Sequence, residues 1–335
     1  MVAMDAANMR RVSAGLMIGW SVWAGGCATP EGGSQKTGPV AGQRWDLPLS
    51  SNATLGLAWI PAGTFTMGSP ASESRRKADE GPQTQVTLTK GYWMGTTLVT
   101  IGQWKAVMGV GVRDQLAKEI NDDTLYELGG KQQRLRDFMG WSREAESTDY
   151  LGNENDELPM YFVSWNDAQE FCQKLTAQER AAGRLPAGYV YNLPTEAQWE
   201  NACRAGTTEA TYAGPNTAAV LDGIAWYAAN SAQGYTGRAV RNGAGPRDVA
   251  KKQPNARGLY DMLGNIWEWC RDWYGPTYPG GSVIDPTGPA SGTERVNRGG
   301  SFGSGPRDER SASRAQNPPP EASAYRGFRV ALCAN

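Results

Sequence analysis

Residues 258–273 read GLYDMLGNIWEWCRDW, and this stretch decides the fold. Its first half holds one carboxylate, Asp261, together with Gly264 and Asn265, which are residue types typical of tight turns. Its second half places tryptophans on both sides of Glu268. Large rings on opposite sides of a carboxylate predict a packed core segment in which the carboxylate anchors an arginine. The candidate partners lie further along the chain: Arg298, Arg310, Arg314 and Arg329.

The composition of the 335-residue chain favours a loop-rich protein of one large domain or two ordinary ones. It contains 42 Gly and 20 Pro, which punctuate the backbone, and 13 Trp, whose rings cover irregular segments. The formal net charge of -1 gives no electrostatic reason to expect a nucleic acid as partner.

The chain contains no histidine. Histidine is the usual general base near neutral pH and the commonest protein ligand of zinc, copper and non-haem iron. Its absence excludes a Ser-His-Asp triad and any iron site that is built on a histidine cluster.

Two later segments complete the pattern: residues 295–302 read RVNRGGSF and residues 327–331 read GFRVA. With residues 258–273 they resemble the signature of the formylglycine-generating enzyme family, also called sulfatase-modifying factors, whose founding members oxidise a sulfatase cysteine to formylglycine. The resemblance covers about residues 57–331, interrupted by an insertion at about 110–157. It implies a loop-rich α+β fold, related to C-type lectins, with two main helices and short antiparallel strands.

The chain departs from this family where the active members carry a pair of cysteines. No cysteine lies between Cys270 and Cys333. Counted from the Gly-Gly-Ser element, the first thiol would fall at Ser304 and the second near Glu309. A hydroxyl and a carboxylate do not form the soft site that Cu(I) prefers, so we expect neither copper nor a catalytic residue here. Leu98, where the family usually has a glutamate, is a milder departure.

The local patterns predict the first strands and the main helices. An alternating pattern at 57–68, closed by glycine, is expected to pair with residues 84–89. Helices are expected to begin after three capping residues, Thr100, Ser164 and Thr195. The insertion carries two weak helical patterns, at 116–120 and 131–138, and is interpreted as a surface excursion.

The first residues resemble a bacterial export signal with a lipobox. Arg10 and Arg11 precede an apolar stretch at 12–22, and residues 24–27 read AGGC. This predicts lipidation of Cys27 and a membrane-anchored lipoprotein that faces the periplasm or the cell exterior. Cleavage by an ordinary signal peptidase and a retained anchor are the alternatives. The expected organisation is a signal segment at 1–27, a flexible linker at 28–52 and one domain at 53–335.

Export would place the remaining cysteines, Cys172, Cys203, Cys270 and Cys333, where disulfides persist. Four cysteines allow three pairings, and the sequence does not choose among them. Buried unpaired thiols are an equally good interpretation of Cys172 and Cys203, because both fall on helical patterns.

The turn at 260–266 predicts a structural calcium ion. One carboxylate followed by closely spaced carbonyl oxygens suits a hard cation. The resemblance implies the side chain of Asp261 and the carbonyls of Met262, Gly264 and Ile266 as ligands. In the alternative interpretation, Asp261 and Asn265 bond to backbone amides and no ion is bound.

A second calcium site of the family begins at the position of Asn230, next to Ser231. This chain offers Arg241 about where the acidic ligand of that site should lie. We therefore expect no second ion.

Three functional hypotheses remain. The first, which we prefer, is a binding or accessory module for a protein or peptide ligand, with a sulfatase as one candidate. Its surface would run from 302 to 326 and include Phe302, Ser304, Arg307, Asp308 and Arg310. The second is an O2-dependent oxidoreductase that acts on a protein or peptide by another route. The third resembles the variable proteins of diversity-generating retroelements, which diversify this segment to bind ligands.

Overall fold

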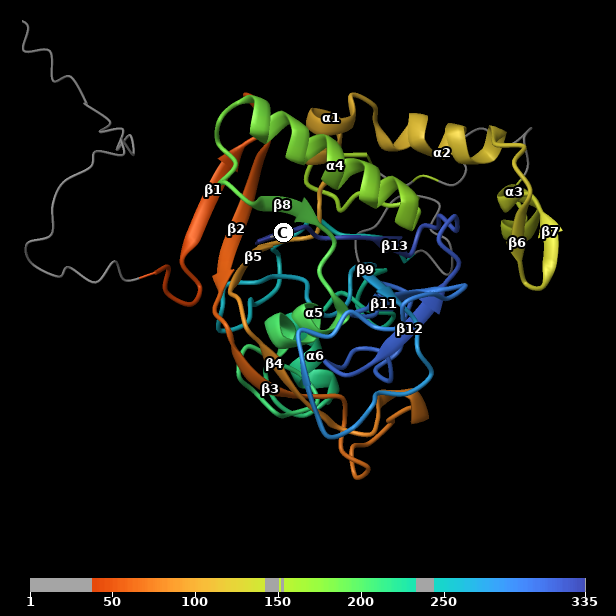
Figure 1. The fold of residues 1–335 in the computed structure, drawn as a ribbon. Helices are drawn as coiled ribbons and strands as arrows, with labels where there is room; N and C mark the ends of the chain where they lie inside the picture. The colour runs from red at the N-terminus through yellow and green to blue at the C-terminus, as the bar shows by residue number, and fades with distance from the viewer. Residues whose placement is uncertain (1–37, 142–150, 152–153, 233–243, 335) are drawn as a thin grey trace, which may run out of the picture. The chain divides into compact units, whose positions relative to one another are not determined.

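The largest sheet joins strands from both ends of the chain (Figure 1). In the computed structural model, residues 38–141, 151, 154–232 and 244–334 are described. The sheet has five antiparallel strands in the order β1 (Arg44–Pro48), β2 (Thr54–Ile60), β5 (Tyr92–Gly95), β14 (Ala331–Ala334) and β8 (Tyr189–Asn192). The expected linker ended at residue 52, but β1 is already paired with β2, so that boundary lies too far along the chain.

Helices cover this sheet on both sides (Figure 1). Helices α1 (Ile101–Met108) and α4 (Trp165–Ala181) pack on one side, in a core that includes Trp104, Phe171 and Leu332. Helices α5 (Glu196–Arg204) and α6 (Ala218–Ile224) contribute to a second core on the other side. The chain therefore builds two apolar cores that share one sheet.

The three predicted helix caps are confirmed. The Oγ1 of Thr100 accepts from the backbone N–H of Gln103 at 3.2 Å. Ser164 and Thr195 cap α4 and α5 in the same way, each at 3.1 Å. Each cap satisfies a backbone donor that has no partner within the helix, which fixes where the helix begins.

Two smaller sheets complete the domain. One has the order β10 (Ser282–Ile284), β4 (Thr84–Leu88) and β3 (Gly63–Met67). The β3–β4 pair confirms the predicted pairing for residues 63–67 only, because residues 57–60 belong to β2 of the large sheet. The other has the order β12 (Arg314–Asn317), β11 (Arg295–Arg298), β9 (Trp267–Trp273) and β13 (Arg326–Gly327). The resemblance implied antiparallel strands, yet β10 runs parallel to β4 and β13 runs parallel to β9, because long loops return these segments in the same direction.

The insertion is partly integrated into the core. The first weak pattern is confirmed as α2 (Val112–Asn121), which buries Val112, Leu116 and Ile120. The second is only partly correct, because β6 (Tyr126–Leu128) and β7 (Lys131–Gln133) form a hairpin before α3 (Leu135–Met139) begins. A purely superficial excursion is therefore the wrong description of the segment that contains α2.

All four cysteines of the described residues are free thiols. Cys172 lies in the core on the α4 side of the large sheet, whereas Cys203, Cys270 and Cys333 pack in the core on the opposite side. Cys333 follows Leu332 on β14, so their side chains point to opposite faces of the sheet. For Cys172 and Cys203, the interpretation as buried unpaired thiols is confirmed. Among the described residues, no helix has the length and apolarity required to cross a membrane.

Candidate functional site

The sheet that contains β9 carries an open cleft of about 700 Å³. Its walls come from the start of β9, the loop after β11, the edge strand β12 and the residues around β13. The lining residues are Trp267, Ser301, Gly303, Ser304, Ala315, Gln316, Asn317, Tyr325 and Arg326.

Ser304, the position of the first expected thiol, lies in the wall of this cleft. Its Oγ accepts from the backbone N–H of Ser301 at 3.1 Å and lies 3.0 Å from the Oγ of Ser301. Both side chains are buried. A serine hydroxyl in this setting stays protonated, so it offers hydrogen bonds to a ligand and no thiolate chemistry.

Glu309, near the position of the second expected thiol, is buried behind the cleft. Neither carboxyl oxygen has a hydrogen-bond partner among the described residues. Burial raises the pKa of Glu309 well above its ordinary value, and the charge of Asp308 adds to this, while the nearby Ser301 amide acts in the opposite direction. This carboxyl therefore keeps its proton to a higher pH than an exposed glutamate does. Gly300, at φ +79°, is required here because a Cβ would lie within 3.0 Å of the Glu309 carboxyl.

A polar wall on the opposite side of the cleft is held by internal hydrogen bonds. The Nδ2 of Asn317 donates to Oε2 of Glu321 at 3.0 Å, and the Nη1 of Arg326 donates to Oε1 of the same carboxylate at 2.6 Å. Asn297 donates to the Oδ1 of Asn317 at 3.2 Å. These contacts fix the orientation of the Asn317 amide and the Arg326 guanidinium before any ligand arrives.

Lys77 brings a cation to the rim of the cleft. Its Nζ lies 6.0 Å from the centre of the Trp267 ring, 2.8 Å from Oδ1 of Asp308 and 3.0 Å from the carbonyl oxygen of Arg314. Trp267 was expected in the core, but it is only partly buried and lines the cleft. The first residue of the strand therefore faces the cleft, whereas Trp269 is fully buried.

The predicted ligand surface is only partly correct. Arg307 is exposed and Asp308 is partly exposed, as a surface residue must be. Phe302 is wholly buried and stacks on Tyr325 with 4.8 Å between ring centres. Arg310 is also wholly buried, where its guanidinium pairs with Glu80 and with Glu73 at 2.6 Å. Phe302 and Arg310 are therefore scaffold residues, because apolar packing and ion pairing hold them inside.

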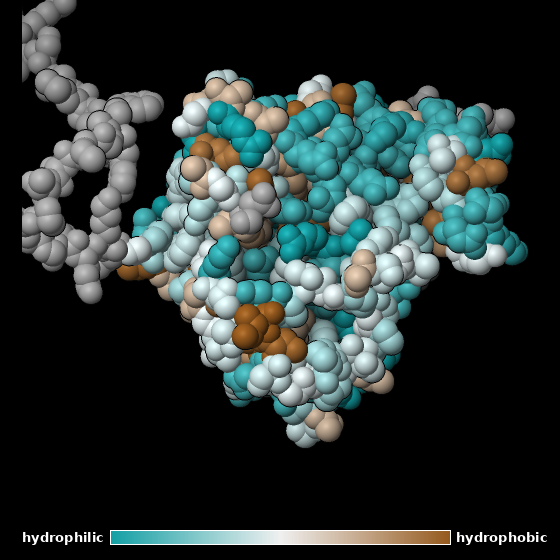
Figure 2. Space-filling model, in the orientation of Figure 1, coloured by the Kyte–Doolittle hydropathy of each residue, from teal (hydrophilic) through white to brown (hydrophobic). Residues whose placement is uncertain are grey.

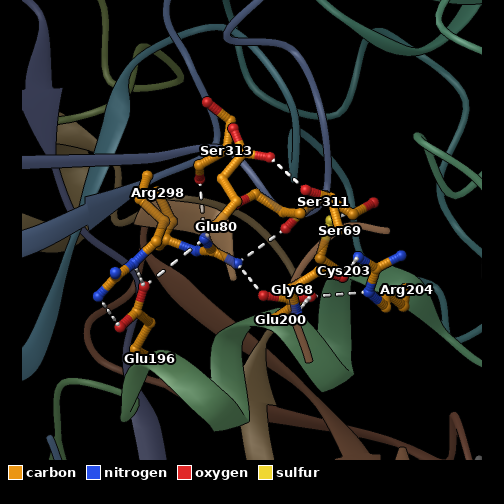
Figure 3. A network of polar contacts seen from close by, with 12 residues as sticks. Gly68, Ser69, Glu80, Glu196, Glu200, Cys203, Arg204, Arg298, Ser311 and Ser313 are labelled. Atoms are coloured by element: carbon orange, nitrogen blue, oxygen red, sulfur yellow. Dashed lines mark hydrogen bonds and ion pairs between the residues drawn. The ribbon is translucent and has the colours of Figure 1, made fainter. Parts of the chain in front are cut away.

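Buried ion pairs and hydrogen bonds join β11, α5 and the segment 311–313 (Figure 3). Arg298 of β11 pairs with Glu200 of α5, and it also donates to the carbonyl oxygens of residues 311–313. Arg204 bonds to the same Glu200 at 2.8 Å. The predicted anchor of Glu268 is Arg329, at 2.6 and 2.7 Å, and Trp199 donates to Glu268 at 2.9 Å.

The other candidate arginines hold different segments. Arg314 forms a two-bond pair with Glu196, with its Nε 2.6 Å from Oε1 and its Nη2 2.9 Å from Oε2. Paired in this way, the buried charges compensate one another and clamp loops that have little regular structure of their own. The interpretation of the C-terminal arginines as scaffold residues is consistent with these contacts.

The predicted calcium turn is closed by hydrogen bonds. Oδ2 of Asp261 accepts from the N–H of Ala250 at 2.8 Å, and Oδ1 of Asn265 accepts from the N–H of Arg247 at 3.0 Å. Burial raises the pKa of Asp261 to about 6. A Cβ on Gly264 would lie within 3.0 Å of the backbone of Trp226, which explains the glycine.

The carbonyl groups of Met262, Gly264 and Ile266 belong to this same turn, and the calcium ion stays a prediction. At the second position, Oδ1 of Asn230 accepts from the N–H of Tyr227 at 3.0 Å, and the Oγ of Ser231 donates to the Phe302 carbonyl at 2.8 Å. Arg241 lies outside the described residues. Cys27, the predicted lipidation site, lies outside them as well.

Sequence reasoning located the region of the cleft but did not single out most of its lining residues. Gln316, Asn317, Tyr325 and Arg326 lie within or at the end of the predicted surface segment, but no individual signal distinguished them from the scaffold arginines. No cysteine lines the cleft, and burial raises the pKa of Cys203 to about 12. In the described part of the chain no three His, Cys, Asp or Glu side chains are grouped to hold a metal.

The fold and the cleft define a class: a loop-rich α+β domain in which a polar cleft is supported by buried arginine–glutamate pairs. The family model of the sulfatase-modifying factor enzyme 1-like domain matches residues 48–334. The chain therefore belongs to the family of formylglycine-generating and sulfatase-modifying proteins, as the resemblance predicted.

Three similar proteins illustrate the range of this family. The formylglycine-generating enzyme of Streptomyces coelicolor is 32% identical over 84% of this chain and 90% of its own length. The inactive C-alpha-formylglycine-generating enzyme 2 of Bos taurus is 27% identical over 86% of this chain and 91% of its own length. Among solved structures, Treponema denticola variable protein 1 is 26% identical with a TM-score of 0.62, covering 87% of this chain and 99% of that one.

Proposed function

We propose that this chain binds an extended peptide in the cleft and does not oxidise it. One observation carries the proposal: the cleft is open and lined with ordered polar groups, while Ser304 and Glu309 stand where the resemblance assigns the copper-binding thiols. Neither group supplies a soft ligand for Cu(I). A relative that is named inactive, from Bos taurus, supports the idea that the fold is used without the founding chemistry.

The edge of β12 supports a peptide as the ligand. Ala315, Gln316 and Asn317 of this strand line the cleft, and among the described residues β12 pairs only with β11. A strand with one unpaired edge can add an extended peptide by main-chain hydrogen bonds, while neighbouring pockets select side chains. The amide of Asn317 and the ring of Trp267 are placed to make those selective contacts.

Two further candidates rest on the comparisons. The 32% identity to the Streptomyces coelicolor formylglycine-generating enzyme favours an oxidoreductase that acts on a protein or peptide, including sulfatase maturation, by a route without the thiol pair. The likeness to Treponema denticola variable protein 1 favours a lectin-like binding protein diversified around 302–326. The lectin-like protein is a form of the binding proposal, whereas the oxidoreductase competes with it.

Export and lipid anchoring are part of the proposal and rest on the first residues of the sequence alone. A lipid on Cys27 would hold the domain at a membrane surface, on the periplasmic or outer side, through the predicted linker. Metabolic labelling with a radioactive fatty acid tests this. Label incorporated into the wild type and absent from the Cys27→Ala variant is the expected result; an unlabelled wild type contradicts anchoring.

A peptide selection separates binding from catalysis. Random peptides displayed on phage are selected on the full chain and on the variant Ala315→Trp, which fills the cleft. The variant Ala182→Trp, at the exposed C-terminal cap of α4, is the matched control. We expect to select peptides that bind the wild type and the control equally well. Their affinity for Ala315→Trp should be at least about tenfold weaker, a difference of about 1.4 kcal/mol in binding free energy.

The same proteins are then given Cu(I), a reductant, O2 and a cysteine-bearing sulfatase peptide, and the peptide mass is followed. An unchanged mass is expected. Conversion of the cysteine to the aldehyde overturns the proposal in favour of the oxidoreductase. A selection that yields no cleft-dependent peptide overturns the peptide-binding role.

A further inference from the structure

A second cavity, of about 500 Å³, lies between β10 and the start of α5. It shares no lining residue with the cleft. The two sites take their walls from opposite ends of β9, because Trp267 lines the cleft whereas Asp272 and Trp273 line the cavity. At about 3.3 Å per residue, they lie roughly 17 Å apart along the strand.

The walls of this cavity are largely apolar. The residues that form them come from β3, β4, α5, β9 and β10 and the loop between the last two: Met67, Val86, Ala197, Trp273, Tyr278 and Val283. Ile284, beside the opening, is one of the large hydrophobic residues that stay exposed, at 70%. The face seen in Figure 2 is mostly hydrophilic, with hydrophobic residues in small separate patches. A concave apolar surface of this size fits a small organic molecule.

Three charged side chains line the cavity, and two of them neutralise each other. Glu196 and Arg314 form the two-bond pair described above. The remaining Arg314 nitrogen, Nη1, donates to the carbonyl oxygens of Asp79 and Gly275 at 2.8 and 2.9 Å. Four of the five guanidinium N–H groups are thus used within the protein, so Arg314 has little left to offer an anion.

Asp272 is the third charged group and is only half satisfied. It is 4% exposed, and its Oδ2 accepts from the N–H of Glu196 at 3.0 Å. No hydrogen bond from a described residue reaches its Oδ1, and this oxygen is not fully enclosed by the protein. An ionised carboxylate buried with one open oxygen favours a ligand that brings both a positive charge and a hydrogen-bond donor.

We infer that this cavity is a binding site for a small hydrophobic amine, whose ammonium group bonds to Asp272 while its apolar part fills the space between β4, β10 and Tyr278. The site is independent of the function proposed for the cleft.

The ionisation of Asp272 gives the binding a defined pH dependence. Burial raises the pKa of Asp272 to about 7; the charge of Glu196 on α5 raises it further, whereas Arg271 on the same strand and Arg314 on β12 lower it. Arg295 on β11 is the other cation that interacts with Asp272. A cationic ligand needs the ionised carboxylate, so its affinity falls as pH decreases through this range.

The test compares three probes of one shape at pH 8: 2-phenylethylammonium, the neutral 2-phenylethanol and the anionic 3-phenylpropanoate. Binding to the full chain is measured by calorimetry. We expect the ammonium to bind at least about tenfold more tightly than the alcohol, and the anion to bind more weakly than both. From pH 8 to pH 6 the affinity for the ammonium should fall about tenfold, and the affinity for the alcohol should change little.

Three variants locate the binding. Asp272→Asn should remove the advantage of the ammonium over the alcohol, and Val283→Phe, which fills the cavity, should weaken both probes. Asp156→Asn is the matched control, since it removes one carboxylate whose side chain is 58% exposed, and should change neither. Ala315→Trp in the cleft should also change neither.

Several outcomes overturn the inference: no binding of the ammonium, equal affinity for ammonium and alcohol, or binding that Val283→Phe leaves intact. If Asp272→Asn does not fold, which thermal unfolding reveals, the pH profile of the wild type and the Val283→Phe variant still decide. If the peptide selection on the cleft fails but the ammonium binds as expected, the amine site remains and only the peptide-binding proposal is lost. If the peptide selection succeeds but the ammonium does not bind, only the amine site is lost.

Discussion

The side-chain oxygens of Ser301 and Ser304 lie 3.0 Å apart, and the N–H of Ser301 donates to the Ser304 Oγ at 3.1 Å. The position assigned to the first thiol is therefore a hydroxyl that the adjacent turn already binds. A hydroxyl held in this way stays neutral, and it completes the wall of the cleft.

Copper binding is the first consequence to test. The full chain, titrated with Cu(I) in competition with a chromogenic chelator, should leave the chelator fully loaded. Ser304 and Glu309 cannot replace thiolates, and Cys172, Cys203 and Cys270 are buried in the core. The control is the same protein unfolded in denaturant. Its four cysteines within the described residues are then accessible and should withdraw copper from the chelator. One equivalent of Cu(I) bound by the folded protein would contradict this prediction.

Glu309 should reduce stability increasingly as the pH rises. Its folded-state pKa is raised above the ordinary 4.5, so above pH 4.5 the unfolded chain releases a proton that the folded chain keeps. Each pH unit in this window costs about 1.4 kcal/mol until the raised pKa is reached. Glu309→Met should therefore increase the free energy of unfolding by about 1–3 kcal/mol at pH 8 and by less at pH 5, measured with urea. Glu170→Met, at an exposed position, is the control; an equal gain at both pH values would argue against a neutral buried acid.

The pair between Glu268 and Arg329 should be essential for stability. Both side chains are buried, and Trp199 donates to the same carboxylate. Glu268→Gln leaves an uncompensated guanidinium in the core and should cost about 3–5 kcal/mol. Glu170→Gln, in an exposed pair with Lys174, should cost less than about 0.5 kcal/mol. Denaturant unfolding of both variants measures the difference, and similar losses would mean that the buried pair is no more important than a surface one.

Calcium should stabilise the protein through Asp261, and more so at pH 7.5 than at pH 5. Without an ion the folded-state pKa of Asp261 is about 6, above the ordinary 3.8. The free energy of unfolding of the protein therefore falls as the pH rises through that interval. An ion bound to the ionised carboxylate would offset the loss. Melting temperatures with saturating calcium and with a chelator measure this, and Asp261→Asn should abolish the difference. Identical melting temperatures in the wild type would favour the interpretation without an ion.

The elements that follow local rules were predictable. Thr100, Ser164 and Thr195 each begin a helix because a capping hydroxyl needs only the next few residues to find its donor. The family signature at 258–273 also predicted an arginine partner for Glu268. The choice of Arg329 among four candidates was not predictable, because it depends on how a distant loop returns to β9.

The cleft was predictable only as a region. Ser304 was placed correctly in its wall, whereas Phe302 and Arg310, assigned to the same surface, are buried. A hydrophobic or charged residue in a loop gives no local signal of its direction, since the direction is set by the partner it meets: Tyr325 for Phe302 and Glu80 for Arg310.

The sequence by itself determined the family, the helix starts, the missing thiol pair and the absence of histidine, because these depend on residue identity and on spacing along the chain. Only the tertiary structure decided which arginine meets which glutamate, which face of the 302–326 segment is open, and that Asp272 lies in an apolar cavity beside Arg314. Those relationships join segments far apart in sequence, and their energies come from burial, which a linear pattern does not contain.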